Sequence, residues 1–143
     1  MSADQGTQEW LMERCGKVTA SRMADVMATI KTGESASRAN YRAELVAQRL
    51  TGQLEAGFTN AAMQWGTEQE PFARASYEIM RGVFVEEVGF VPHPQIMMAG
   101  ASPDGLVGSD GMVEIKCPNT ATHIAFLLDG KIPQKYQLQM AWQ

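Results

Sequence analysis

Residues 102–118 read SPDGLVGSDGMVEIKCP and decide the fold, because two short β-rich runs there are joined by Ser109-Asp110-Gly111. A three-residue hairpin loop that ends in glycine commonly connects antiparallel strands. In the register that this loop predicts, Asp104 lies opposite Lys116, and Glu114 shares their face of the hairpin. A two-residue loop would turn Asp104 to the other face, so the predicted geometry depends on the glycine.

Two carboxylates and a lysine on one face predict a site for a hard cation. Asp104, Glu114 and the main-chain carbonyl of Ile115 are donors that Mg²⁺ or Mn²⁺ prefers. A protonated Lys116 is no ligand, but beside a metal-bound water it can orient or deprotonate the nucleophile or neutralise a phosphoryl oxygen. This chemistry predicts phosphodiester hydrolysis. From these residues alone, a solvated turn with a surface salt bridge is the alternative.

Outward from the hairpin, the second half of the chain alternates between β-rich runs and helical patterns. The runs at 83–91, 96–108 and 112–117 are separated by Gly, Pro and Asp and predict three or four strands. Helices are expected over 120–128 and 133–143, the second with Pro133 at its first helical position.

The first half is predicted to be mostly helical. A short helix over Gln8–Arg14 ends near Gly16, and a second helix begins behind Thr19 or Ser21 as N-cap and runs toward Ile30.

Two longer helices are expected next. Ser37 caps one that ends at Gly52. A helical pattern follows over 59–80, and because proline is tolerated only in the first turn, Pro71 predicts that the main helix begins near Thr67.

Composition fits one globular domain spanning residues 1–143 of mixed α/β (α+β) class. The 143 residues are 45% hydrophobic and 20% charged, with no apolar run long enough to cross a membrane, so a cytosolic protein is expected. Cys15 and Cys117 are far apart, which excludes a disulfide framework and predicts free thiols. A net charge of −4 argues against a histone-like DNA binder but leaves a metal-dependent nuclease open.

An ordered series of motifs resembles the lambda-type phage exonucleases, a viral recombinase and alkaline exonuclease family within the PD-(D/E)xK nuclease superfamily. The resemblance covers nearly the whole chain and implies a restriction-endonuclease-like core, with a central mixed β-sheet flanked by helices. In chain order the motifs are Trp10 with Arg14, Val18-Thr19-Ala20-Ser21, Trp65-Gly66-x-x-x-Glu70, Ser102-Pro103-Asp104-Gly105, Glu114-Ile115-Lys116-Cys117-Pro118 and Tyr136-x-x-Gln139.

The resemblance implies a Mg²⁺-dependent 5′→3′ exonuclease of the bacterial cytoplasm, with two ions per site and Mn²⁺ able to substitute. Such enzymes act on double-stranded DNA ends, favour a 5′-phosphate and leave a 3′ overhang for a phage single-strand annealing protein. They are ring-shaped homotrimers. Family members continue past the Tyr-x-x-Gln segment with further strands and helices that this chain is expected to lack, which puts its trimer assembly and processivity in doubt.

The resemblance also assigns roles at the metal site. Asp104 and Glu114 match the metal-binding carboxylates, Lys116 matches the catalytic lysine and Glu70 matches a helix-borne acid of the same site. Glu70 has a second interpretation, because Thr67-x-x-Glu70 also has the pattern of a capping box.

Further residues match positions that contact DNA. Arg14 and Ser21 match residues that hold the terminal 5′-phosphate, and Ser102 is expected to join them. Gln139 matches a glutamine that contacts DNA near the site, and Tyr136 lies one turn earlier on the same helix face. Without the family, Arg14 is an ordinary surface arginine, Ser21 an N-cap and Tyr136 as much a core residue as a DNA contact.

Two other functions stay open at this point. One is a restriction-like endonuclease of the same fold, which would cleave covalently closed DNA. The other is a non-catalytic DNA-binding or assembly fragment, which would bind DNA without Mg²⁺-dependent cleavage.

Overall fold

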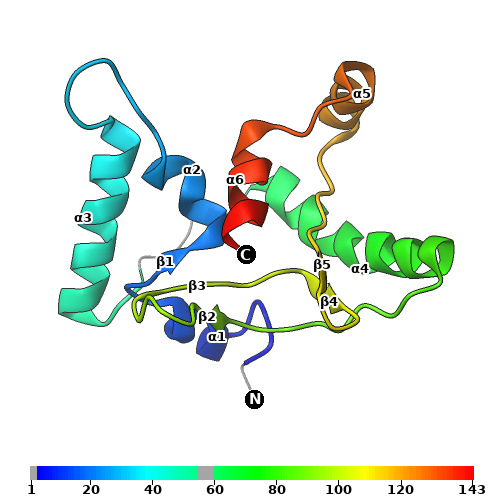
Figure 1. Ribbon diagram of the computed structural model, residues 1–143, viewed down its shortest axis with the longest axis horizontal. Coiled ribbons are helices and arrows are strands. Elements are labelled where there is room, and N and C mark those ends of the chain that lie inside the picture. The colour runs from blue at the N-terminus through cyan, green and yellow to red at the C-terminus, as the bar shows by residue number, and fades with distance from the viewer. Residues whose placement is uncertain (1–2, 55–59) are drawn as a thin grey trace. The chain divides into compact units, whose positions relative to one another are not determined.

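The computed structural model describes residues 3–54 and 60–143, which form the helices and short strands labelled in Figure 1. This part of the chain divides into two compact units. Both units contain helices and strands, so the predicted mixed α+β class is confirmed. No helix in the described ranges is both long and apolar enough to cross a membrane. The first unit comprises residues 3–54, 88–102 and 133–143, and the second comprises residues 60–87 and 103–132.

The first unit holds a mixed three-stranded sheet in the order β1-β3-β2, formed by Val18–Thr19, Ala99–Ala101 and Val91–Pro92. β1 is parallel to β3, and β2 is antiparallel to it. All three residues of β3 are buried, which suits the small side chains of the central strand. β1 was not predicted, because two residues are too few to show the alternation that identifies a strand.

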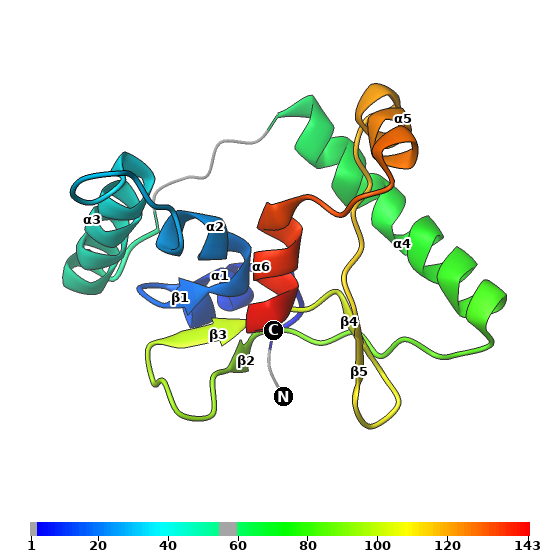
Figure 2. The same ribbon diagram turned by 45° about the horizontal axis from the view of Figure 1, so that its top comes forward.

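Helical segments complete this unit and supply much of its core. α6 packs against η1 and α2, as Figure 2 shows. The helical segments are α1 (Gln8–Arg14), the 3₁₀ helix η1 (Ala20–Arg22), α2 (Met23–Val26), α3 (Ala36–Thr51) and α6 (Gln134–Trp142). The buried apolar side chains of the unit are Ala20, Met23, Tyr41, Leu45, Phe90, Ala99 and Ala101.

Three predicted helix starts in this unit are wrong, although the bounds of α1 agree with the prediction. Thr19 ends β1 and makes no capping hydrogen bond, and Ser21 lies inside η1, because a 3₁₀ turn directly follows the strand. α2 then has only four residues. Ser35, not Ser37, caps α3, since its Oγ accepts from the backbone N–H three residues on. Pro133 is the N-cap of α6 and not its first helical residue, so the helix begins one residue later than predicted.

In the second unit, α4 is one continuous helix, Ala61–Arg81, and contains Pro71. The expectation of a helix start near Thr67 is wrong, because Asn60 caps α4 through its side chain. The proline removes one intrahelical hydrogen bond, but the remaining bonds of a 21-residue helix outweigh that loss. Thr59, where the predicted helical pattern begins, lies outside the described residues.

The predicted hairpin is present as β4 (Gly105–Val107) and β5 (Gly111–Val113), but its loop lies one residue earlier. Val107 pairs with Gly111, so the loop is residues 108–110. Gly108, with φ +63°, takes the left-handed position that the prediction gave to Gly111. Moving the loop by one residue shifts the cross-strand partner of each residue by two. Because side chains alternate between the two faces of a strand, a shift of two residues leaves each side chain on its predicted face.

Two further segments complete the second unit. Glu86 forms an isolated antiparallel bridge with Leu106. In this unit, that bridge is the part of the strand predicted over 83–91 that the described residues show. α5 spans Thr120–Asp129, close to the predicted helix, and Asn119 caps it through its side chain.

Candidate active site

Asp104 and Ile115 close the open end of the β4–β5 hairpin in the second unit. The backbone N–H of Ile115 donates to Oδ2 of Asp104 over 2.6 Å. The observed pairs, Gly105 with Val113 and Leu106 with Met112, correct the predicted register in which Asp104 lies opposite Lys116. The hydrogen bond nevertheless brings Asp104 to the peptide between Glu114 and Lys116, so the three charged residues gather at one end of the hairpin.

Glu114 and Lys116 form an ion pair through Oε1 and Nζ. The Glu114 side chain is 3% exposed and that of Lys116 is 35% exposed. The carboxylate is therefore shielded from water while the ammonium group remains accessible. An ammonium group held in this way is available to a substrate that approaches the hairpin end.

Burial and the neighbouring carboxylates together perturb the ionisation of Asp104. Burial, together with the negative charges of Glu114 and Glu70, raises the pKa of Asp104 to about 6. The Ile115 N–H and the Lys116 ammonium oppose this rise. Such a site is short of positive charge, and a divalent cation would supply it.

The donor set fits Mg²⁺ in its chemistry, since carboxylate oxygens and a main-chain carbonyl are the ligands that this ion prefers. The side chains are not gathered as a closed metal site, however. Among the described residues, no three His, Cys, Asp or Glu side chains lie close enough together to hold an ion. Glu114 is paired with Lys116, and Glu70 is paired with Arg74.

Glu70 lies in the interior of α4, one turn before Arg74. The capping-box interpretation of Glu70 is wrong, because the hydroxyl of Thr67 donates to the Met63 carbonyl inside the helix. Instead, Oε1 of Glu70 accepts from Nη2 of Arg74 over 2.7 Å. Sequence analysis overlooked Arg74, although an acid and an arginine four residues apart are a known helix pair.

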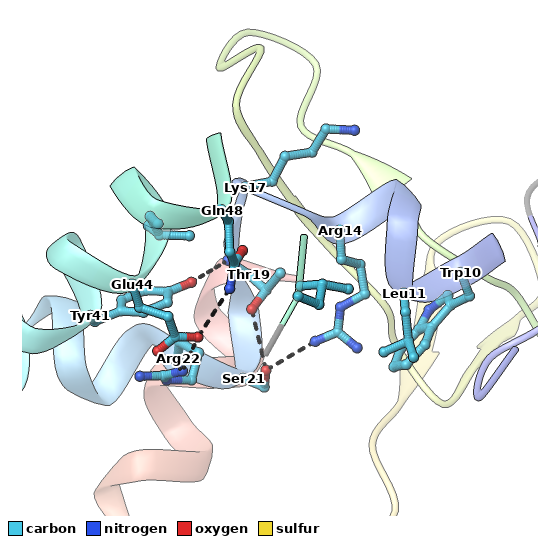
Figure 3. A pocket seen from close by; sticks show the side chains of 12 residues that line it. Trp10, Leu11, Arg14, Lys17, Thr19, Ser21, Arg22, Tyr41, Glu44 and Gln48 are labelled. Carbon is cyan, nitrogen blue, oxygen red and sulfur yellow. Dashed lines mark hydrogen bonds and ion pairs between the residues drawn. The ribbon is translucent and has the colours of Figure 1, made fainter. Parts of the chain in front are cut away.

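A pocket of about 290 Å³ lies in the first unit, and Figure 3 shows the side chains around it. Arg14 points its guanidinium toward Ser21, with 3.5 Å between Nη2 and Oγ. The other face of the arginine covers the Trp10 ring, 4.0 Å from its centroid. The lining residues are Trp10, Leu11, Arg14, Lys17, Thr19, Ser21, Arg22, Tyr41, Glu44, Leu45, Gln48 and Leu54.

The charges in the pocket distinguish its two arginines. Arg22 is neutralised by Asp25 at 2.6 Å and by Glu44 at 3.0 Å. Arg14 forms no ion pair within the described ranges, and burial lowers its pKa. A guanidinium keeps its charge at neutral pH, so Arg14 presents to the pocket a partly desolvated cation that has no ion-pair partner within the described ranges. Such a group suits an anionic ligand, above all a phosphate.

Side chains of α3 hydrogen-bond to the backbone between Arg14 and Ser21. Oε1 of the buried Gln48 accepts from the Gly16 N–H over 2.8 Å, and Nε of Arg49 donates to the Gly16 carbonyl over 2.7 Å. The Tyr41 hydroxyl accepts from the Thr19 N–H over 3.2 Å. Sequence analysis did not identify Gln48 or Tyr41 as supports of this pocket, because their partners lie 32 and 22 residues away.

The remaining predicted DNA contacts also belong to the first unit, but they do not line the pocket. Ser102 Oγ accepts from the Trp10 indole N–H over 3.0 Å, so Trp10 contacts both Ser102 and Arg14. Gln139 is buried in α6, and Tyr136 is half-buried three residues earlier, with the Lys135 ammonium 4.7 Å from its ring centroid.

Comparison with known proteins shows what the chain resembles. Residues 9–143 match the model of the YqaJ-like viral recombinase domain. A crystal structure of LHK-Exo in complex with dAMP matches with a TM-score of 0.88 and 57% identity, over 96% of this chain and 67% of that chain. A crystal structure of an alkaline exonuclease (LHK-Exo) from Laribacter hongkongensis matches with a TM-score of 0.85 and 56% identity, over 96% of this chain and 69% of that chain. No curated protein matches. The resemblance found in the sequence is confirmed, as is the nuclease fold.

Proposed function

Because the chain belongs to the YqaJ-like viral recombinase family, we propose that it is a Mg²⁺-dependent 5′→3′ exonuclease acting on double-stranded DNA ends in the bacterial cytoplasm. It degrades the 5′-phosphorylated strand and leaves a 3′ overhang. The observation that carries this proposal is the gathering of Asp104, Glu114 and Lys116 at one end of the hairpin. The similarity to an alkaline exonuclease supports it.

Asp104, Glu114, Glu70 and the Ile115 carbonyl are the groups that would hold Mg²⁺, as one ion or two. The chemistry that the ion supplies when bound is neutralisation of phosphoryl charge and a lower pKa for water. Both effects favour attack of water on a phosphodiester. The excess of carboxylates around Asp104 supports this assignment, since a cation would relieve their repulsion.

Lys116 handles charge and protons in the proposed reaction. Its ammonium group is accessible while it pairs with the shielded Glu114, so it can contact a phosphate oxygen or the attacking water. In either position it stabilises negative charge that develops at phosphorus, and it can hold the water in line with the scissile bond. Loss of this group therefore removes catalysis more than it removes metal binding.

The pocket around Arg14 and Ser21 receives the terminal 5′-phosphate in this proposal. The uncompensated guanidinium of Arg14 supports the assignment, because a phosphate would pair with it by charge-assisted hydrogen bonds. Ser102, Gln139 and Tyr136 are proposed to contact DNA near the site. A structural neighbour in complex with dAMP supports a nucleoside monophosphate as the released product.

Assembly and partners follow the family in this proposal. The chain covers 67% and 69% of the two structural neighbours, so part of those proteins has no counterpart in it. A homotrimer and a single-strand annealing partner are proposed.

The test is digestion of linear duplexes that carry a 5′-phosphate on one strand only, with Mg²⁺ or with EDTA, beside a closed circular duplex. Selective Mg²⁺-dependent loss of the phosphorylated strand is the expected result. Cleavage of the circle would favour the restriction-like endonuclease. DNA binding without any cleavage would favour the non-catalytic fragment.

A further inference from the structure

Arg74 is the least exposed of the ion-paired arginines in the structure's described residues, with a side chain 12% exposed. It extends from the interior of α4 and contacts two carboxylates of the same unit. Nη2 lies 2.7 Å from Oε1 of Glu70, and Nη1 lies 2.6 Å from Oε1 of Glu87. Glu87 is 69% exposed, so one partner faces water and the other belongs to the candidate metal site.

The contact with Glu70 engages one carboxylate oxygen. Arg74 binds Oε1 only, and this single contact fixes the direction in which the carboxylate group points. A metal ligand needs one oxygen, and ligating carboxylates are commonly held by a hydrogen bond to the other. The geometry is therefore compatible with a Glu70 that binds Arg74 and a metal ion together.

Glu87 keeps Arg74 compensated if Glu70 shares its charge with a metal ion. Without Glu87, drawing Glu70 toward a cation would leave a nearly buried guanidinium without a full counter-charge, which is unfavourable. With Glu87 at 2.6 Å, the arginine retains a partner. Nε of Arg74 is buried and has no hydrogen-bond partner among the described residues, so the side chain is placed for its two Nη contacts and not for full hydrogen bonding.

We infer that Arg74 is a positioning residue that holds the Glu70 carboxylate for the metal ion of the active site. The inference rests on the proposed function, because it needs Glu70 to be a ligand. A positioning role and simple electrostatics predict opposite changes in cation affinity when Arg74 is removed. Removing a positive charge near a cation site normally tightens cation binding, whereas removing a group that positions a ligand weakens it, commonly by 10- to 100-fold.

The test measures Mn²⁺ affinity of the whole chain by the loss of the free-ion EPR signal, with no DNA present. Arg74→Ala should bind Mn²⁺ about 10-fold more weakly. Arg81→Ala is the matched control, since Arg81 ends the same helix and its loss changes the net charge equally. That variant should bind as well as the original or slightly better. Circular dichroism checks that each variant is folded, and Arg74→Lys, which keeps the charge, should give an intermediate affinity.

A double-mutant cycle with Glu70→Gln separates positioning from a general structural effect. If Arg74 acts through Glu70, Arg74→Ala should change Mn²⁺ affinity little in the Glu70→Gln background. An equal loss in both backgrounds, or tighter binding by Arg74→Ala, would overturn the inference while leaving Glu70 a ligand. If Glu70→Gln alone does not weaken Mn²⁺ binding, the ligand role of Glu70 fails and the inference fails with it.

Discussion

Arg14→Ala should abolish most of the preference for a 5′-phosphorylated end while leaving hydrolysis itself intact. Of the two arginines that line the first-unit pocket, Arg14 forms no ion pair within the described ranges, and its guanidinium contacts Ser21 and the Trp10 ring. The carboxylates and the lysine of the candidate metal site belong to the other unit. The substitution therefore removes the phosphate-binding group without removing a metal ligand.

The size of the effect follows from the surroundings of Arg14. Two unit charges 4 Å apart attract by about 4 kcal/mol at the effective dielectric constant of a protein surface and by about 1 kcal/mol in bulk water. The partly desolvated Arg14 lies between these limits, and a hydrogen bond to a charged group contributes about 1.5–3 kcal/mol. A loss of about 2–3 kcal/mol corresponds to a roughly 30- to 150-fold fall in the rate ratio of phosphorylated to hydroxyl ends.

The assay compares initial rates on two duplexes that differ only in the terminal 5′-phosphate, under single-turnover conditions. Using the ratio of the two rates cancels differences in folded fraction and in metal binding. Arg42→Ala is the control, because Arg42 belongs to the same unit, is 67% exposed and pairs with Glu34 outside the pocket. An unchanged ratio in Arg14→Ala, or an equal fall in Arg42→Ala, would refute the proposed role of the pocket.

Three further predictions concern the hairpin and the central strand. Lys116→Ala should lower turnover by about 100- to 10,000-fold while Mn²⁺ still binds, whereas Asp104→Ala should lose both; full activity of either variant in the digestion assay would contradict the assignment. The raised pKa of Asp104 means that the folded state favours the proton, so stability from this group is fully present below pH 4 and is lost as pH rises toward about 6. Without metal, Asp104→Asn should therefore become more stable than the original protein as pH rises through this window, by on the order of 1 kcal/mol after discounting for solvent screening. Urea titrations measure this difference in unfolding free energy at pH 4 and at pH 8, and an equal difference at the two pH values would count against the prediction. Gly100→Ala should destabilise by about 2–3 kcal/mol, because its Cβ would lie 2.3 Å from Phe90 Cζ, whereas Gly66→Ala in α4 has an ordinary 3.7 Å contact and should stabilise by about 0.5–1 kcal/mol; thermal unfolding that ranks the two variants alike would contradict this.

Local patterns were sufficient wherever a feature depends on neighbouring residues. The bounds of α1 and the glycine end of α3 agree with the sequence predictions. A capping side chain, an apolar period and a left-handed glycine all act within one or two turns of a helix. The error of two residues at the start of α3 arises because Ser35 and Ser37 are both suitable N-cap residues.

Long-range pairing was the main source of error. β1 exists because β3 lies beside it, and nothing in Val18–Thr19 alone marks a strand. Pro71 led to the prediction of a helix start near Thr67. The remaining hydrogen bonds of the continuous α4 outweigh the one that this proline removes. The roles of Gln48 and Tyr41 depend on partners more than 20 residues away, so their own neighbourhoods carry no signal of them.

The sequence by itself determined which chemical groups occur together along the chain and on which face of a strand they lie. Asp104, Glu114 and Lys116 are predicted to share a face because side chains alternate with a period of two, and the shift of the loop preserves the two faces of the paired strands. Only the tertiary structure decided which groups pair. In the tertiary structure the Ile115 N–H donates to Asp104, and Arg74 forms ion pairs with both Glu70 and Glu87. Arg14 lies in a pocket beside Ser21. Burial, charge compensation and hydrogen bonding depend on distances in space, which the order of residues alone does not specify.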